Sequence, residues 1–179
     1  MELQELVLSR RSIRHYQEGV TISENEILEM IECAKQAPSW KNSQTARYYA
    51  AITKESIAKI MEEGLPEFNA NNSRNAAALI VTTFEKKRAG FNREGVADNE
   101  LGDEWGAYDL GLQNSILLLK AKEMGYDTLV MGIRDGEALR RILSIPDSQE
   151  VVAVIAVGKR VDTPEAPKRK PTEDIVKFF

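Results

Sequence analysis

The chain has 179 residues, with 24 Lys or Arg against 28 Asp or Glu, so its net charge is −4 at pH 7. This length corresponds to about one domain. The 42% hydrophobic and 29% charged residues are typical of a globular protein, which excludes disordered and collagen-like chains. A single cysteine and a single histidine exclude an intrachain disulfide and a metal site built from Cys or His clusters.

The N-terminus lacks the apolar core of a signal peptide, and no run approaches the roughly 20 apolar residues of a membrane span. We therefore expect a cytoplasmic protein without a membrane partner. The negative net charge argues against a nucleic-acid partner, because binding to phosphates needs a basic surface.

The first part of the chain predicts two helices on either side of a basic segment. Residues 2–9 have the apolar spacing of a short helix, and residues 10–16 (RRSIRHY) follow it. Ser23 with Glu26 three residues later forms a capping box, which predicts the start of a second helix that stops before Pro38.

Strands and helices then alternate. After an irregular loop we expect a strand at 47–52, a helix at 54–63, and a loop or frayed helix at 68–75. The continuous apolar run 77–84 predicts a strand that is buried on both faces. Residues 85–104 are polar and rich in Gly and Asn, which favours a flexible flap.

A long helix is expected at 105–124, followed by a strand at 127–131. Asp135 then caps a further helix, and 151–157 (VVAVIAV) is a second strand buried on both faces. Alternating strands and helices indicate one α+β domain, a three-layer α/β sandwich spanning residues 1–179. The basic, proline-rich tail 159–179 is too polar for a core and is expected to wrap over the body or over a partner chain.

Motifs for chemistry carried by the protein itself are missing. The sequence has no HExxH or CxxC motif and no GxGxxG after a strand. At the P-loop spacing, Leu112 and Gln113 replace the Lys-Ser/Thr pair. This favours a binding protein or an enzyme whose cofactor performs the reaction.

Three segments carry candidate binding groups. In an extended chain Arg10, Ser12 and Arg14 project to one side and suit an anionic group; the alternative is a solvated basic turn. The polar loop 38–44 could bond the edge of a heteroaromatic ring, or be an ordinary turn. The cluster 168–170 (KRK) could bind an anion, or be a solvated tail.

Taken in order, these segments resemble the FMN-dependent nitroreductase family over essentially the whole chain. RRSIRHY, APSWKNSQTAR, the Asp109-x-Gly111-x-Gln113-Asn114 helix and the ending VVAVIAVGKR with KRKP carry the resemblance. Two places depart from the family pattern: Thr45 stands where proline is usual, and Gly125-Tyr126-Asp127 replaces the commoner Gly-Leu-Gly turn.

The resemblance implies an intertwined homodimer with a central, mainly antiparallel sheet and two FMN sites at the interface, with the tail crossing onto the partner. It assigns Arg10, Ser12 and Arg169 to the phosphate and ribityl chain and Arg14 to the pyrimidine edge of the ring, with the Gly132 N–H facing N5. The implied FMN-binding set is Arg10, Arg11, Ser12, Arg14, Asn71, Arg74, Val130, Met131, Gly132, Ile133 and Arg169, with Pro38, Ser39, Trp40 and Asn42 reaching FMN from the partner subunit.

The implied activity is that of an oxidoreductase that moves a hydride from NAD(P)H through FMN N5 to a nitroaromatic, a quinone or a similar conjugated acceptor, by a ping-pong cycle. No catalytic side chain and no metal are needed. Phe91 and Trp105 are expected to act as a substrate lid. The alternatives are another flavin reaction on the same fold, such as reductive dehalogenation or flavin destruction, and an FMN-binding storage or sensor protein without turnover.

Overall fold

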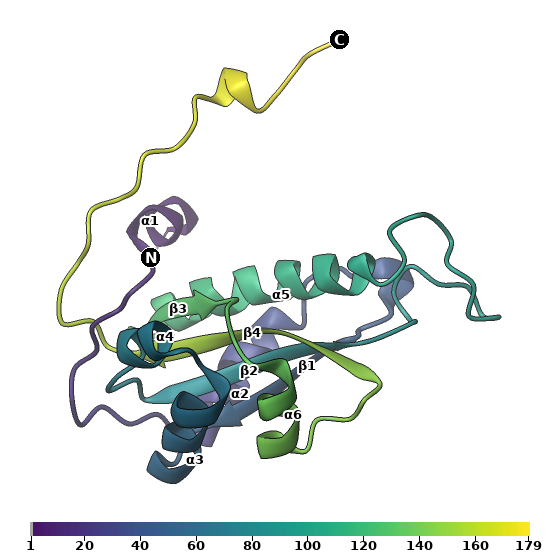
Figure 1. Cartoon of the computed structure of the whole chain (residues 1–179). Coiled ribbons are helices and arrows are strands. Elements are labelled where there is room, and N and C mark those ends of the chain that lie inside the picture. The colour runs from purple at the N-terminus through teal and green to yellow at the C-terminus, as the bar shows by residue number, and fades with distance from the viewer. Residues whose placement is uncertain (1) are drawn as a thin grey trace.

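The computed structural model describes residues 2–179 and has one central antiparallel sheet with helices on both faces (Figure 1). The strand order is β1-β2-β4-β3, and every neighbouring pair is antiparallel. The strands are β1 (Ala46–Ala51), β2 (Ala78–Glu85), β3 (Asp127–Met131) and β4 (Gln149–Gly158).

Two helices cover one face of the sheet and three shorter ones cover the other, so the predicted α+β three-layer sandwich is confirmed. Helices α2 and α5 pack on the first face, and α3, α4 and α6 lie on the second. The helices are α1 (Leu3–Ser9), α2 (Glu24–Ala34), α3 (Lys54–Lys59), α4 (Glu67–Asn72), α5 (Glu104–Glu123) and α6 (Gly136–Leu143), with single turns η1 (Trp40–Asn42), η2 (Ile60–Gly64) and η3 (Thr172–Asp174).

The two central strands explain the continuous apolar runs of the sequence. Side chains alternate between the faces of a strand, so Ile80 and Ile155 enter the core under α2 and α5. Leu79, Val81 and Val154 enter the core on the opposite face. Because both faces are covered by helices, neither set can be polar, and the alternating pattern of a half-exposed strand is lost.

Most local predictions are confirmed, including the Ser23 capping box and the Asp135 cap, whose carboxylate accepts the Ala138 N–H at 2.9 Å. The second helix ends at Ala34 and so stops before Pro38, as expected. Two elements differ: the helix expected at 54–63 changes at Ile60 into the π-helical turn η2. The region 68–75 contains α4, whose Asn69 side chain is buried.

The N-terminal segment and the chain after β4 are joined to the edge of the sheet beside β3. The Ile13 N–H donates to the Thr128 carbonyl at 3.0 Å, and the Gln17 N–H donates to the Lys159 carbonyl at 2.9 Å. Gly158 has no room for a side chain, because a Cβ there would lie 2.6 Å from the Tyr16 ring. These contacts place the basic N-terminal segment along the last strand of the sheet.

Asp127 anchors this junction. Its side chain is only 5% exposed, and its carboxylate accepts from Lys122 Nζ at 3.1 Å and from Arg160 Nε at 2.9 Å. Arg160 also donates to the Ser9 carbonyl at 3.5 Å, at the end of α1. Burial by itself raises the pKa of Asp127, but the hydrogen bonds from Arg160 and Lys122 outweigh it and hold the pKa below its ordinary value.

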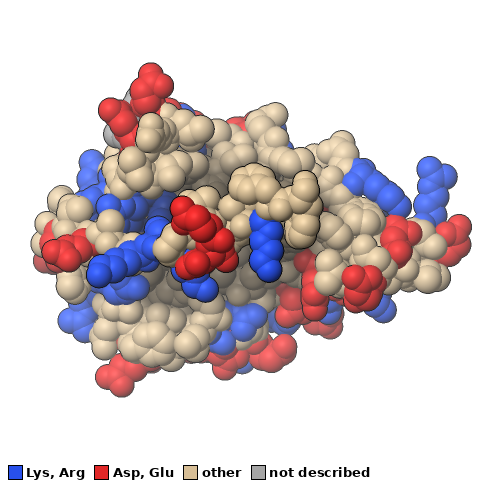
Figure 2. Space-filling view, turned by 90° about the horizontal axis from the view of Figure 1, so that it is seen from above, with Lys and Arg blue, Asp and Glu red and all other residues tan. Residues whose placement is uncertain are grey.

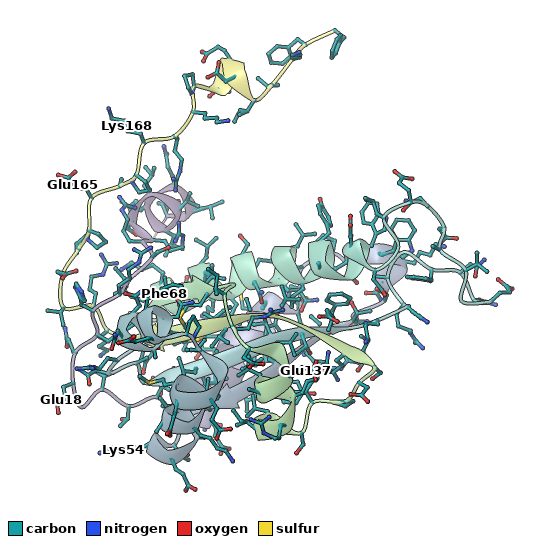
Figure 3. The ribbon with its side chains drawn as sticks, viewed as in Figure 1. Glu18, Lys54, Phe68, Glu137, Glu165 and Lys168 are labelled. Atoms are coloured by element: carbon teal, nitrogen blue, oxygen red, sulfur yellow. The ribbon has the colours of Figure 1, made fainter. Side chains whose placement is uncertain are left out.

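The tail extends away from the body instead of packing on it (Figure 1). Residues 161–179 are all exposed, and Glu165 and Lys168 point outward in Figure 3. The accessible surface of 10923 Å² exceeds the roughly 8,700 Å² expected for a compact monomer of this mass. The excess accessible surface agrees with a tail that does not pack against the rest of its own chain.

Replacing Asp127 by Asn should lower the free energy of unfolding by about 3 kcal/mol, because two largely buried cations lose their counter-charge. Asp162→Asn is the matched control, since it removes an exposed carboxylate that lies 2.8 Å from His15. The control should cost less than about 1 kcal/mol. Urea unfolding at neutral pH measures both changes, and equal effects would contradict the anchoring role of Asp127.

The same pair of proteins should show a pH dependence. Because the pKa of Asp127 is lower in the folded than in the unfolded chain, its stabilisation is complete above the unfolded value and is lost as pH falls through the folded value. The stability difference between wild type and Asp127→Asn should therefore stay constant down to about pH 5 and shrink below about pH 4.

Candidate functional site

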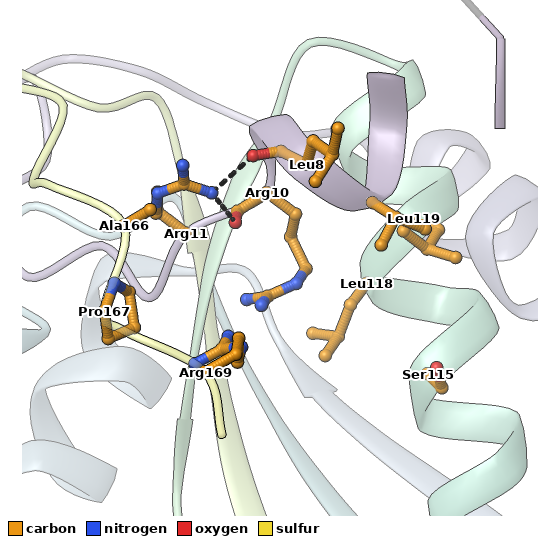
Figure 4. Close-up of a pocket in the computed structure, with 10 residues that line it drawn as sticks. Leu8, Arg10, Arg11, Ser115, Leu118, Leu119, Ala166, Pro167 and Arg169 are labelled. Atoms are coloured by element: carbon orange, nitrogen blue, oxygen red, sulfur yellow. Dashed lines mark hydrogen bonds between the residues drawn. The ribbon is translucent and has the colours of Figure 1, made fainter. Parts of the chain in front are cut away.

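The cations of the N-terminal segment and the tail meet at one cavity. Arg10, Arg11, Ser12, Arg14 and Arg169 line a space of about 260 Å³ between the segment and the tail. An adjoining cavity of about 400 Å³ is bounded by α1, α5 and the tail, and Arg10 and Arg169 project into it (Figure 4). Viewed from above, Lys and Arg side chains gather at the left of the molecule, on the side where the tail leaves the body (Figures 1 and 2).

These arginines differ in how their charges are used. Arg11 donates to the Leu8 carbonyl at 2.6 Å and to the Arg10 carbonyl at 2.8 Å, so it mainly holds the chain (Figure 4). Arg14 bonds only the Ser12 carbonyl, at 3.3 Å. Within residues 2–179, neither Arg10 nor Arg169 forms a hydrogen bond or an ion pair with its side chain. Both guanidinium groups are therefore free to bind an anion.

An apolar floor continues from Arg10 between α5 and the sheet. This cavity, about 510 Å³, is lined by Arg10, Ala107, Leu110, Gly111, Asn114, Ser115, Leu118, Val130, Val152 and Ala153. Val130 is 46% exposed although it lies in a strand. The side-chain amide oxygen of Asn114 (Oδ1) is buried there without a partner among the described residues. A cation at one end and an apolar surface beyond it suit a planar ligand that carries an anionic group.

The end of β3 places its residues differently from one another. Val130 lies on the α5 side of the sheet, whereas Met131 is 2% exposed and packs in the core on the opposite side. The Met131 side chain therefore points away from the apolar floor, which leaves its backbone for the predicted contact with the ring. Gly132 is exposed, and a Cβ there would contact nothing within 4 Å. The residue after Gly132, Ile133, is held by Asn69, whose side-chain amide donates to the Ile133 carbonyl at 2.8 Å.

The loop 38–44 lies at the other end of α5. The buried carboxylate of Asp109 accepts the Trp40 N–H at 2.8 Å. Burial raises the pKa of Asp109, and this hydrogen bond partly opposes the rise. The Trp40 ring lies 4.6 Å from the ring of Trp105, measured between centroids. Pro38, Ser39, Trp40 and Asn42 line none of the three cavities that contain Arg10.

Two further groups of predicted residues lie apart from the arginine cavities. Asn71 and Arg74 are exposed at the end of α4, where Arg74 bonds Asn71 at 3.3 Å, and neither lines these cavities. Phe91 of the flap lines a cavity of about 620 Å³ together with Trp40. Trp105 packs between Trp40 and Tyr108 and supports this wall from behind.

The flap 85–104 protrudes at one end of α5 (Figure 1) and is built of turns. The Asp98 N–H donates to the Gly90 carbonyl at 2.8 Å, and Trp105 Nε1 donates to Asn99 at 2.9 Å. Lys41 reaches the flap from the loop and pairs with Asp98 at 2.7 Å. The region that composition marked as flexible is thus held by specific hydrogen bonds to its surroundings.

Comparison with known proteins decides the family. The model of the nitroreductase family matches residues 7–159. The chain belongs to the nitroreductase family. MhqN of Bacillus subtilis (strain 168), whose name assigns it to the NAD(P)H nitroreductases, is 27% identical over 99% of both chains. YdgI of the same strain, with the same kind of name, is also 27% identical, over 99% of this chain and 97% of its own.

Solved structures agree with this assignment. A nitroreductase from Exiguobacterium sibiricum 255-15, crystallised in complex with FMN, has a TM-score of 0.83 and 26% identity, covering 100% of this chain and 98% of its own. An NAD(P)H:FMN oxidoreductase from Staphylococcus epidermidis ATCC 12228 superposes with a TM-score of 0.84 at 22% identity and supports the fold. In residues 2–179, no helix is both long and apolar enough to cross a membrane.

Several residues that line or support these cavities were not predicted from the sequence. Gly111, Ser115 and Leu118 line the cavities from one face of α5, and Asn69 supports the end of β3. Gly111, Ser115 and Leu118 are spaced four and three residues apart, and this helical repeat is the sequence signal that places them on one face of α5. Asn69, by contrast, lies 64 residues from its partner Ile133, and no local pattern indicates that pairing.

Asp109→Ala should loosen the loop 38–44, because the partly buried Trp40 N–H would lose its acceptor at a cost of about 1–3 kcal/mol. Asp98→Ala is the matched control, since it removes the ion pair of the same loop through exposed Lys41 and should cost less than about 1 kcal/mol. Amide hydrogen exchange at Trp40 measures the difference. Faster exchange in Asp98→Ala than in Asp109→Ala would contradict this assignment.

Proposed function

We propose that the protein is an FMN-dependent oxidoreductase that uses NAD(P)H to reduce a nitroaromatic, quinone or similar conjugated acceptor. The observation that carries the proposal is the continuous space from the free cations Arg10 and Arg169 to the apolar floor at Val130. FMN has a phosphate at one end and a flat ring at the other, so these residues fit it. The FMN-bound relative and the names of the curated relatives support the same reading.

The resemblance to the family suggests a role for each group. Arg10, Ser12 and Arg169 would hold the phosphate and ribityl chain, and Arg14 would lie near the pyrimidine edge, where a cation stabilises the negative charge of the reduced ring. Val130 would support the ring by contact. The open backbone at Gly132 would let its N–H approach the ring closely, which a side chain at that position would hinder.

A second copy of the chain would complete the site. Pro38, Ser39, Trp40 and Asn42 line none of the cavities that contain Arg10, so one chain does not bring the two sets together. Residues 161–179 of the tail are all exposed. A homodimer in which the loop of one chain reaches the cations of the other, with the tail crossing between them, accounts for both observations.

The chemistry that FMN supplies when bound is acceptance of a hydride from NAD(P)H and its later delivery to an acceptor. The protein would orient both substrates in turn at one ring, which gives a ping-pong cycle. The site has no activated nucleophile, so a cofactor-borne reaction agrees better with its residues than acyl or phosphoryl transfer. Asn71 and Arg74 remain proposed ring-edge residues through their place in the sequence pattern.

The purified, dialysed protein should show flavin absorption that bleaches when NADPH or NADH is added without oxygen. Bound flavin that bleaches no faster than free FMN would favour a storage or sensor protein.

Arg169→Ala should weaken FMN binding about tenfold, as expected for one charge-assisted hydrogen bond to phosphate. Lys177→Ala in the same tail is the control and should bind FMN normally. A colourless protein that takes up no FMN would overturn the proposal.

Phe91→Ala and Trp105→Ala should each change the KM for the acceptor severalfold while FMN stays bound, because both side chains build the wall next to Trp40. Phe68→Ala is the control: this exposed aromatic residue lies on α4, on the other side of the sheet (Figure 3). Steady-state kinetics with a quinone and a nitroaromatic test the lid. Loss of FMN, or unchanged kinetics in both variants, would contradict the assignment.

A further inference from the structure

The segment 132–135 joins β3 to α6 and has no regular secondary structure (Figure 1). It begins two residues after Val130, which lines the apolar floor, and its first residue is Gly132. Gly132 is exposed, and Ile133 is 65% exposed. Because these residues bury little surface, the position of their backbone depends on hydrogen bonds from neighbouring elements.

The first of these hydrogen bonds comes from Asn69 on α4. Its side-chain amide donates to the Ile133 carbonyl at 2.8 Å, although 64 residues separate the two in the sequence. Asn69 is only 6% exposed, and Ser73 Oγ fixes its backbone by donating to the Asn69 carbonyl at 2.9 Å. Asparagine is a poor residue for a helix and is seldom buried, so this hydrogen bond is the evident use of the side chain.

The second hydrogen bond comes from the π-helical turn η2. The Asp135 N–H donates at 2.9 Å to the carbonyl of Gly64, the last residue of that turn. A Cβ on Gly64 would lie 2.5 Å from Leu139 Cδ2, and Leu139 is fully buried on α6. Glycine therefore lets η2 approach α6 closely enough for this hydrogen bond. Single π-helical turns are frequent near functional sites.

The segment is thus held on both sides of Arg134, whose own side chain donates to the Val151 carbonyl on β4. Asn69 and Gly64 line none of the three cavities that contain Arg10. Both reach the segment through its backbone atoms, at Ile133 and at Asp135. Any effect of these two residues on a ligand at the apolar floor must therefore pass through the backbone of 132–135.

We propose that Asn69 and Gly64 are positioning residues that hold the Gly132 N–H in place against N5 of bound FMN. This inference rests on the proposed function. In oxidised FMN, N5 has a lone pair that can accept this N–H, whereas in reduced FMN the same atom carries a hydrogen. A well-placed N–H therefore binds the oxidised form preferentially. Because hydrogen bonds weaken steeply with poor geometry, a looser segment loses that preference.

Asn69→Leu keeps a similar side-chain volume and removes the donor. In the FMN-saturated protein it should weaken the binding of oxidised FMN about fivefold relative to reduced FMN, as expected for one hydrogen bond. This ratio corresponds to a rise of about 20 mV in the midpoint potential of bound FMN. Anaerobic redox titration measures it. A residue that only stabilises the fold would weaken both forms equally and leave the midpoint potential unchanged.

Gly64→Ala is a second, independent variant, because its methyl group would push against Leu139 and displace the Gly64 carbonyl. It should shift the midpoint potential in the same direction. Thr53→Ala is the matched control: it removes the N-cap of α3, whose hydroxyl accepts the Ser56 N–H at 3.1 Å. The control should lower the thermal midpoint and leave the midpoint potential of FMN unchanged.

Amide hydrogen exchange in the full chain without added FMN tests the hydrogen bonds themselves. The Asp135 N–H should exchange severalfold faster in Asn69→Leu than in Thr53→Ala, because the segment 132–135 loses one of its supports. Equal exchange in the two variants would overturn the positioning role.

The redox titration separates this proposal from the proposed function. A chain that binds FMN with the same midpoint potential in wild type and Asn69→Leu would overturn the role of Asn69 alone. A chain that binds no FMN would overturn the proposed function and, with it, the positioning role toward FMN. If Asn69→Leu fails to fold, the midpoint potential of Gly64→Ala decides, and a value equal to that of Thr53→Ala would overturn the proposal.

Discussion

The carboxylate of Asp127 lies where distant parts of the chain meet: the end of α5 through Lys122, the start of β3, and the segment after β4 through Arg160, which also bonds the Ser9 carbonyl at the end of α1. Arg10 follows Ser9 directly, and Arg169 lies nine residues beyond Arg160. The convergence of these two cations therefore depends on one buried ion cluster. Its carboxylate stands in the turn that departs from the family pattern, so the departure has a structural use.

The rest of the architecture separates stability from chemistry. The two central strands carry mainly apolar side chains on both faces, and their buried Thr82, Thr83 and Gln149 are hydrogen-bonded within the sheet layer. Polar and charged residues gather instead at the sheet edge beside β3 and at the loop and flap near the start of α5. Helix α5 links these regions, since Asp109 holds the Trp40 loop at one end and Ser115 and Leu118 face the arginines further along.

Charge is distributed unevenly for an acidic protein. Among residues 2–179, the side chains of Arg10 and Arg169 have no charged partner at one cavity, and those of Lys87, Arg88 and Arg93 have none at another. Unpaired cations beside partly enclosed cavities cost little because water still reaches them, yet they bind strongly to an anion that displaces that water. A protein that handles phosphate-bearing molecules at a shared ring would need such groups, and it would need few reactive side chains of its own.

The sequence by itself determined what depends on near neighbours: the Ser23 capping box, the Asp135 cap, the strands buried on both faces, and the RRSIRHY and APSWKNSQTAR segments that indicated the family. One local expectation was wrong: the helix predicted at 54–63 changes into a π-helical turn at Ile60. Only the tertiary structure decided that Asp109 holds Trp40, that Asp127 joins the two terminal segments, and that Thr45 lies buried beside Arg88. The paired residues are 69, 33 and about 40 positions apart in the sequence, respectively. Contacts over such separations are set by how the helices pack on the sheet, which no pattern of adjacent residues encodes.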